Sequence, residues 1–286
     1  MAVGTIYVVA TPIGNLEDIT RRAERILGEV DVVAAEDTRR TRVLLQHLGL
    51  SKPLVSYYDA IEATRAPELI ERALAGESIA LVSDAGTPLL SDPGFRLVGE
   101  AHAAGVRVIP IPGPSAPLAL LSCAGLPAGR FTFLGFLPAK TQARRKFAAE
   151  YSDHRDTLVL FETARRLPAA LQDLAEVLGP RDAVIGRELT KKFEELVRGT
   201  LEELAARYAG ADDAERVRGE LVLAIAGAPD PRTEVGGVDD PIVGERLRAR
   251  FAEGESASRA ARAVALELGL PRRDVYRRAI EESETD

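Results

Sequence analysis

The residues best suited to ligand binding or catalysis lie in the stretch from Val82 to Gly94, which reads VSDAGTPLLSDPG. Its first carboxylate, Asp84, directly follows the apolar run from Ser78 to Val82, which is typical of a buried strand. A second loop rich in proline, IPIPGPSA at residues 109–116, ends another apolar run. Ligands in open α/β sheets bind beyond the carboxyl ends of the strands, where loops of this kind lie. The two loops therefore predict a small-molecule site that offers main-chain hydrogen bonds more than charge.

Asp84 is compatible with two roles. An aspartate beside a glycine commonly caps a turn. It can also accept hydrogen bonds from the ammonium or hydroxyl groups of a ligand. The second role is favoured here because the other loop, at residues 113–116, opens a helix after a neighbouring strand.

The loop after the first apolar run, ATPIGNLEDIT at residues 10–20, lacks the Gly-x-Gly-x-x-Gly pattern of a dinucleotide-binding loop. The chain also has no Gly-x-x-x-x-Gly-Lys-Ser/Thr string, so a P-loop nucleotidase is not expected. The segment Pro12-Ile13-Gly14 forms either a tight turn or a cofactor contact, and the sequence alone favours neither.

Three carboxylates are candidates for a general base. Glu36 and Asp37 follow the second apolar run and precede a predicted helix. Acidic residues are favourable at this positive end of a helix, so capping is the favoured role of Asp37. Either side chain can also remove a proton or orient a substrate hydroxyl. Glu188, in a polar cluster after a later strand, is the third candidate.

Basic residues form short clusters that suit phosphate groups, although the default role of each cluster taken alone is the solvated face of a helix. The candidates for contacts to an RNA backbone are Arg39, Arg40 and Arg42; Lys140, Arg144, Arg145 and Lys146; and Arg187, Lys191 and Lys192. Tyr57 and Tyr58 offer rings for stacking on a base, with one of the two expected in the core.

The composition bounds the class of protein. A chain of 286 residues exceeds the usual size of one domain, which predicts two domains and an appendage. The single cysteine excludes an internal disulfide and fits a reducing compartment, so we expect a cytoplasmic protein; with three histidines it provides no zinc-type ligand set. No run approaches the roughly 20 apolar residues of a membrane helix, and the N-terminus lacks the basic region of a signal peptide. The net charge of −7 argues against a uniformly basic surface but leaves local basic patches open.

Strand-like and helix-like runs alternate along the chain, which predicts a largely parallel α/β architecture. The expected strands are 5–10, 30–35, 54–56, 78–83, 106–110, 131–134, 157–161, 183–187 and 221–226. The expected helices are 19–27 with Asp18 as N-cap, 38–47, 67–75, one after Pro93, 115–123, 140–151, 165–178 and 201–208. The charged stretch 189–199 is assigned to neither class.

These elements predict an N-terminal α/β domain at residues 1–120, a second α/β domain at 121–228, a linker at 229–243 and a helical module at 244–286. The linker is rich in proline, glycine and aspartate. In the module, Gly269-Leu270-Pro271 separates two helices, as in a helix-turn-helix. The segment from Arg246 to Arg278 contains nine arginines and four acidic residues, which makes it the most basic compact segment of the chain.

Taken together, these segments resemble the tetrapyrrole (corrin/porphyrin) methylase superfamily, and most closely its ribosomal RNA branch, the 16S rRNA (cytidine 2′-O)-methyltransferase I type. The strings that carry the resemblance are VVATPIGNLEDIT, VAAEDTRRTRVLL, ALVSDAGTPLLSDPGFRLV, VIPIPGPSA, GLPAGRFTFLGFLP and IGRELTKKFEELVRGTL, in this order between residues 8 and 201. AEDTRRT and RELTKKFEE favour the RNA branch, and the tail VALELGLPRRDVYRRAIEE resembles its C-terminal module. FETARR at 161–166 and SYYDAIEATR at 56–65 depart from the pattern, both in loops expected to face the substrate.

The resemblance implies two α/β domains with a cleft between them for S-adenosyl-L-methionine, and a homodimer. The cofactor contacts that carry over are Pro12, Ile13, Asp84, Thr87, Pro88, Ser115, Ala116, Leu189 and Ala226. The implied reaction is methylation of a cytidine 2′-oxygen in the decoding region of 16S rRNA or the small ribosomal subunit. Glu36, Asp37 and Glu188 are then the candidate bases, with water or a lysine as the alternative. The candidate RNA contacts are Arg39, Arg40, Lys140, Lys191 and Lys192.

Two other functions stay open on the sequence. One is methyl transfer to a tetrapyrrole or another small molecule, against which the low aromatic content of 5% and the basic tail count mildly. The other is a non-catalytic RNA-binding or ribosome assembly factor whose cofactor loops are vestigial.

Overall fold

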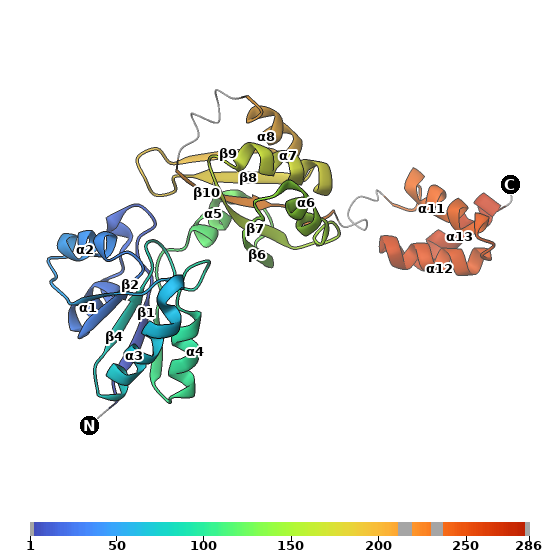
Figure 1. The fold of residues 1–286 in the computed structure, drawn as a ribbon. Coiled ribbons are helices and arrows are strands. Elements are labelled where there is room, and N and C mark those ends of the chain that lie inside the picture. Colours follow the sequence, from blue (N-terminus) through green and yellow to red (C-terminus); the bar gives the residue numbers. More distant parts are fainter. Residues whose placement is uncertain (1–2, 211–218, 230–236, 284–286) are drawn as a thin grey trace. The chain divides into compact units, whose positions relative to one another are not determined.

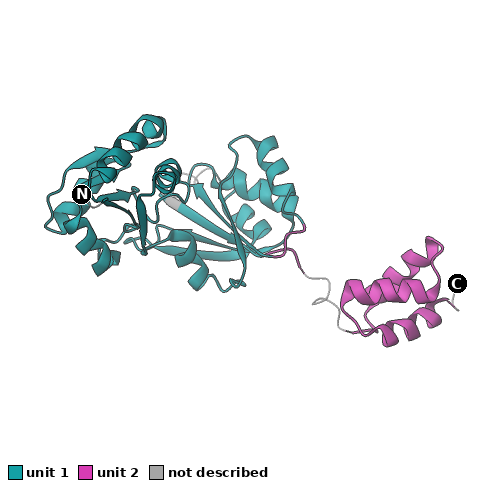
Figure 2. Cartoon of the chain, turned by 90° about the horizontal axis from the view of Figure 1, so that it is seen from below, with its two compact units in different colours: residues 1–152, 156–226 teal, residues 153–155, 227–286 magenta. Residues whose placement is uncertain are grey.

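The computed structural model describes residues 3–210, 219–229 and 237–283 of the chain (Figure 1). Residues 1–152 and 156–226 form one compact unit, and residues 153–155 and 227–286 form a second (Figure 2). The first unit holds two five-stranded sheets and the second is helical. In the described part of the chain, no helix is both long enough and apolar enough to span a membrane.

The first sheet is parallel and has the strand order β3-β2-β4-β1-β5. Its strands are β1 (Thr5–Val9), β2 (Val32–Ala35), β3 (Leu54–Ser56), β4 (Ile79–Val82) and β5 (Arg107–Ile111). Every residue of β2 and β4 is buried, because helices cover both faces of the sheet. α1 (Arg21–Glu29) and α2 (Thr38–His47) pack on one face, and α3 (Glu62–Leu74) and α4 (Phe95–Ala103) pack on the other (Figure 1).

The start of α1 corrects a prediction. Thr20, and not Asp18, is the N-cap, since its side chain accepts a hydrogen bond from the main-chain N–H of Ala23. Asp18 instead ends a short 3-10 turn, Leu16–Asp18 (η1), and the helix ends at Glu29 rather than at the predicted residue 27. A second 3-10 turn, η2, spans Asp59–Ile61.

The second sheet has the strand order β6-β7-β10-β8-β9, and only the β6–β7 pair is parallel. Its strands are β6 (Phe131–Phe136), β7 (Thr157–Thr163), β8 (Asp182–Arg187), β9 (Glu195–Thr200) and β10 (Glu220–Ile225). The expectation of a largely parallel architecture was therefore wrong for this half. The strand β9 was missed because it is an edge strand in which only Val197 is buried, so it has no apolar run.

Helices cover both faces of the second sheet as well. α6 (Thr141–Ala149), α7 (Leu167–Leu178) and α8 (Leu201–Arg207) share one core with it. α5 (Ala116–Ala124) packs on the opposite face, where Leu120 and Leu121 join a core with β7, β8 and β10. The predicted boundary between residues 120 and 121 thus runs through a helix that packs on the second sheet.

The described residues of the helical unit form three helices rather than the two expected around the turn at residues 269–271: α11 (Pro241–Ala252), α12 (Ala257–Leu268) and α13 (Arg272–Ser283). Val243, Leu247, Val264, Leu268 and Val275 are part of its core. α11 begins inside the predicted linker because Asp240 caps it, and residues 230–236 of that linker lie outside the described residues.

Candidate functional site

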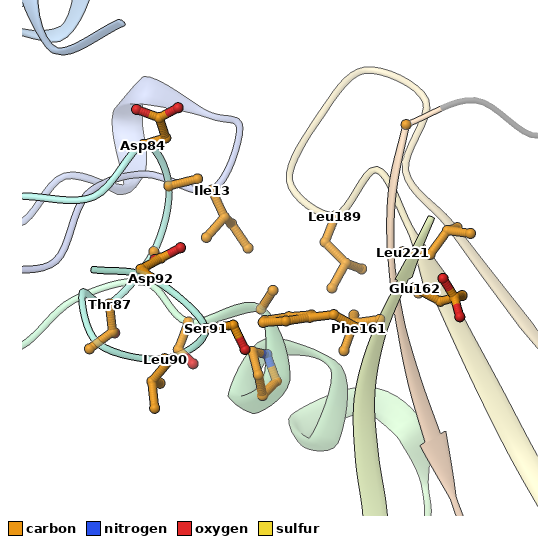
Figure 3. A pocket seen from close by; sticks show the side chains of 18 of the residues that line it. Ile13, Asp84, Thr87, Leu90, Ser91, Asp92, Phe161, Glu162, Leu189 and Leu221 are labelled. Atoms are coloured by element: carbon orange, nitrogen blue, oxygen red, sulfur yellow. The ribbon is translucent and has the colours of Figure 1, made fainter. Parts of the chain in front are cut away.

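A cavity of about 300 Å³ in the first unit is lined from two sides (Figure 3). Loops at the carboxyl ends of the first sheet's strands provide one wall, with Ile13, Asp84, Thr87 and Asp92 among its side chains. The second sheet and its loops provide the other, with Phe161, Glu162, Leu189 and Leu221. The cavity lies where the proline- and glycine-rich loops predicted a ligand site.

The ends of β2 and β4 are joined by two reciprocal hydrogen bonds. The main-chain N–H of Asp84 donates to Glu36 Oε2 at 3.1 Å, and that of Asp37 donates to Asp84 Oδ1 at 2.9 Å. Arg40 Nη1 lies 3.4 Å from Asp84 Oδ2. Burial raises the pKa of Glu36, and the nearby Asp84 carboxylate adds to the increase. Glu36, Arg40 and Asp84 all line the cavity, so Glu36 is a carboxylate with raised proton affinity at its wall.

Asp37 has a different role from its neighbour. Its carboxylate caps α2 by accepting the N–H of Arg39 at 2.8 Å, as the favoured prediction expected. The hydrogen bond from the Arg39 side chain lowers the pKa of Asp37 to about 2. Asp37 is not among the residues that line the cavity, so it is poorly placed to act as a base there.

The loops after β1, β4 and β5 hold one another in place. Thr11 and Gly86 exchange two main-chain hydrogen bonds, of 2.8 and 3.0 Å. The hydroxyl of Thr87 donates to the carbonyl oxygen of Pro114 at 3.2 Å. Gly113 passes so close to Ala10 that an added Cβ would lie 3.0 Å from the Ala10 side chain. The first wall is therefore a preformed frame of main-chain groups.

Ser115, the N-cap of α5, lines this frame and is 8% exposed. Its hydroxyl has no hydrogen-bond partner among the described residues. A buried hydroxyl without a partner costs roughly 1–3 kcal/mol, which a polar ligand in the cavity would remove. Next to it lie the first main-chain N–H groups of α5, which a helix leaves unsatisfied. The N–H groups suit acceptors such as ribose oxygens or a carboxylate, and the Ser115 hydroxyl can also accept from an amino group.

The opposite wall includes the loop after β8, which also contacts the first sheet's loops. The main-chain N–H of Asn15 donates to Thr190 Oγ1 at 3.1 Å, and Lys191 Nζ lies 3.0 Å from Glu188 Oε1. Glu188 and Thr190 have positive φ angles, of 48° and 67°. Within the described chain, the other non-glycine residues with positive φ are Leu89 and Ser91, in the loop after β4. Such strain commonly gathers at ligand sites, and here it occurs in the two loops that face each other across the cavity.

Sequence reasoning missed two carboxylates of the cavity, Asp92 and Glu162. Burial raises the pKa of Asp92 to about 6, and the charges of Glu36 and Asp84 add to the increase. Glu162 is 1% exposed; burial raises its pKa, Arg166 Nε lies 3.2 Å from its Oε1, and its Oε2 has no hydrogen-bond partner among the described residues. Asp92 belongs to the SDPG string already singled out, which was the available signal. Glu162 had none, because one acid in an apolar strand looks like a strand end.

The raised pKa of Asp92 predicts a pH-dependent stability. The folded protein holds this proton more tightly than the unfolded chain, so stability is lost as pH rises from about 4 through about 6. Asp92→Asn is expected to increase the free energy of unfolding by about 1–3 kcal/mol near pH 7.5, with little change near pH 4. Urea denaturation at both pH values measures this. Asp153→Asn, at an exposed position, is the control, and an equal effect of Asp92→Asn at both pH values would contradict the prediction.

The predicted site residues divide into two groups. Those that line the cavity are Ile13, Glu36, Arg40, Asp84, Thr87, Ser115, Ala116, Glu188, Leu189 and Lys191. Those that do not are Pro12, Asp37, Pro88 and Ala226, together with the exposed Arg39, Lys140 and Lys192. Of the other basic candidates, Arg144 is buried and paired with Asp173, so it is not an RNA contact. Tyr57 is the core tyrosine, fully buried, and Tyr58 is 43% exposed. The described residues contain no group of three His, Cys, Asp or Glu placed to hold a metal ion.

Comparison with known proteins identifies the two parts of the chain. Residues 5–205 match the family Tetrapyrrole (Corrin/Porphyrin) Methylases, and residues 238–283 match the RsmI C-terminal HTH domain. Ribosomal RNA small subunit methyltransferase I of Xylella fastidiosa is 47% identical over 96% of this chain and 98% of its own length. The protein of the same name from Mesorhizobium japonicum is 46% identical over 98% of this chain and 92% of its own. In fold, the chain resembles a uroporphyrin-III C-methyltransferase from Thermus thermophilus, solved with S-adenyl homocysteine, with a TM-score of 0.51, 23% identity, and coverage of 77% of this chain and 97% of that one.

Proposed function

The chain belongs to the tetrapyrrole (corrin/porphyrin) methylase family, in the branch of ribosomal RNA small subunit methyltransferase I, and on this premise we propose that it transfers a methyl group from S-adenosylmethionine to the 2′-oxygen of a cytidine in 16S rRNA. The target is in the decoding region, and the enzyme is cytoplasmic and works as a homodimer. The observation that carries the proposal is the cavity that the predicted cofactor loops and the loop after β8 line together.

The residues of the first wall fit the cofactor. Asp84 offers a carboxylate to the hydroxyl or ammonium groups of the ligand, and Ser115 offers an unpaired hydroxyl beside the start of α5. Ile13 and Ala116 provide apolar contacts from this wall, and Leu189 provides one from the opposite wall. When bound, S-adenosylmethionine supplies a methyl group on a sulfonium sulfur, which is already activated for displacement by the 2′-oxygen.

Positioning and proton removal are the tasks left to the protein. A 2′-hydroxyl is a poor nucleophile until it loses its proton, and an oriented attack supplies much of the rate. The Glu36 carboxylate accepts this proton, since Glu36 lines the cavity and burial raises its pKa. Glu188 is the alternative base, although its carboxylate is held by Lys191. Arg40 and Lys191, both at the cavity wall, bind the flanking phosphates.

A methylation assay tests the proposal. The full-length protein is incubated with methyl-labelled S-adenosylmethionine and, in separate reactions, small ribosomal subunits, protein-free 16S rRNA and a tetrapyrrole. We expect the label in RNA, on the ribose of one cytidine. Nuclease digestion followed by mass spectrometry locates the labelled nucleotide. Label on a base, or only in the tetrapyrrole, would contradict the proposal. Titration calorimetry with the cofactor addresses the non-catalytic alternative, which predicts no heat of binding.

A further inference from the structure

Two phenylalanine side chains on the second wall have no task in the site described so far. Phe136, the last residue of β6, lines the cavity although 51% of its surface is exposed. Phe161, on β7, lines the cavity beside it, and its ring lies on the second-sheet side in Figure 3. Exposure of a phenylalanine ring to water is unfavourable, so its position at a ligand cavity indicates that an apolar group of a ligand covers it.

A bulge brings the two rings together. β6 and β7 pair in register at Phe133 and Val159, and then shift so that Phe136 lies opposite Phe161. The residue that makes this possible is Gly135, whose φ of +63° other residues rarely adopt. A Cβ at Gly135 would also lie 3.1 Å from Ser91 Oγ, so the bulge adjoins the loop after β4. Bulges re-aim side chains near functional sites, and this one turns an aromatic ring toward the cavity.

Three phenylalanine rings contact one another in a row that leads from the core to the solvent. Phe161 meets Phe133 edge to face, with centroids 5.1 Å apart, and meets Phe136 at 5.4 Å with a tilt of 45°. Phe133 packs against the buried core under α5. Phe161 thus packs against the core-facing side of Phe136. A large part of the Phe136 ring stays accessible to a planar apolar partner.

We propose that Phe136, supported by Phe161, is the stacking surface for the base of the target nucleotide. This inference rests on the proposed function, because a nucleotide brought out of structured RNA loses its neighbours and needs a replacement for their stacking. The cofactor has an adenine of similar chemistry. The RNA base is the occupant we assign, because the polar groups suited to the cofactor lie on the first wall, whereas Phe136 is the most exposed aromatic residue of the cavity.

The test compares Phe136→Ala, Phe136→Leu and Phe136→Trp with the wild-type protein. Phe95→Ala is the matched control, since Phe95 is 82% exposed and does not line the cavity. Steady-state methylation of small ribosomal subunits gives kcat and KM for RNA, and calorimetry gives the cofactor Kd. We expect Phe136→Ala to lower kcat/KM for RNA about 10- to 100-fold, the range that loss of base–aromatic stacking gives. Phe136→Trp should restore it, Phe136→Leu should not, and the cofactor Kd should stay within about twofold.

Three results would overturn the assignment. Equal kcat/KM for Phe136→Ala and wild type removes the stacking role. Full activity of Phe136→Leu would show that position 136 needs only an apolar side chain for packing and not an aromatic ring for stacking. If Phe136→Ala loses affinity for the cofactor while RNA binding is intact, Phe136 stacks on the adenine of the cofactor and not on the RNA base. A wild-type protein that methylates no RNA refutes the proposed function itself, and is seen before any variant is compared.

Discussion

Asp84→Ala is expected to weaken binding of S-adenosylmethionine about 10- to 100-fold. Asp84 Oδ1 accepts the main-chain N–H of Asp37 at 2.9 Å. The other carboxylate oxygen faces Arg40 at 3.4 Å, and this arginine side chain is 62% exposed, so the pair is weak. That oxygen is therefore available to a ligand in the cavity. A hydrogen bond to a charged group contributes about 1.5–3 kcal/mol, which corresponds to the expected loss. Titration calorimetry measures the Kd.

Asp31→Ala is the matched control for this variant. Asp31 accepts the main-chain N–H of Ser78 at 2.7 Å and joins the same two strands, β2 and β4, at their opposite ends. It is not a cavity residue. We expect Asp31→Ala to lower the thermal midpoint about as much as Asp84→Ala and to leave the Kd unchanged. If both variants weaken binding equally, or if neither does, Asp84 acts only as a structural cap.

Asp173→Ala is expected to destabilise the first unit by about 3–5 kcal/mol. The side chains of Asp173 on α7 and Arg144 on α6 are 4% and 3% exposed, and Arg144 Nε donates to Asp173 Oδ2 at 2.7 Å. Arg145 Nε donates to the other carboxylate oxygen, also at 2.7 Å. Removing this carboxylate leaves the Arg144 guanidinium buried without its counter-charge. Urea denaturation followed by circular dichroism measures the change.

Two further variants separate the buried charge from simple loss of contacts. Glu176, on α7 like Asp173, is an exposed partner of Arg145. Glu176→Ala should lower the free energy of unfolding by less than about 1 kcal/mol. Replacing both buried partners, as R144M with D173L, should recover most of the loss, since a buried pair can be exchanged for apolar groups at little cost. A double replacement as unstable as Asp173→Ala would show that the charge is not the cause.

The amino-acid sequence by itself determined the first sheet and its loops. β2 and β4 are fully buried, so each appears in the sequence as a continuous apolar run that ends at a polar loop. The same local chemistry predicted α2 at residues 38–47 with Asp37 as its cap, because a cap depends only on near neighbours. The family, too, followed from strings of residues that the comparisons bear out.

The tertiary structure decided what depends on residues distant in the chain. The antiparallel pairing of β7, β8 and β10 has no local signal, and β9 has almost no buried residue that would reveal it. Asp92 and Glu36 acquire raised pKa values only because folding buries them near other carboxylates. Phe136 joins Phe161 only through a bulge in a strand pair. The physical reason is common to all three: strand partners, burial and electrostatic neighbours are set by contacts between segments, whereas a single sequence records the local preferences of each segment alone.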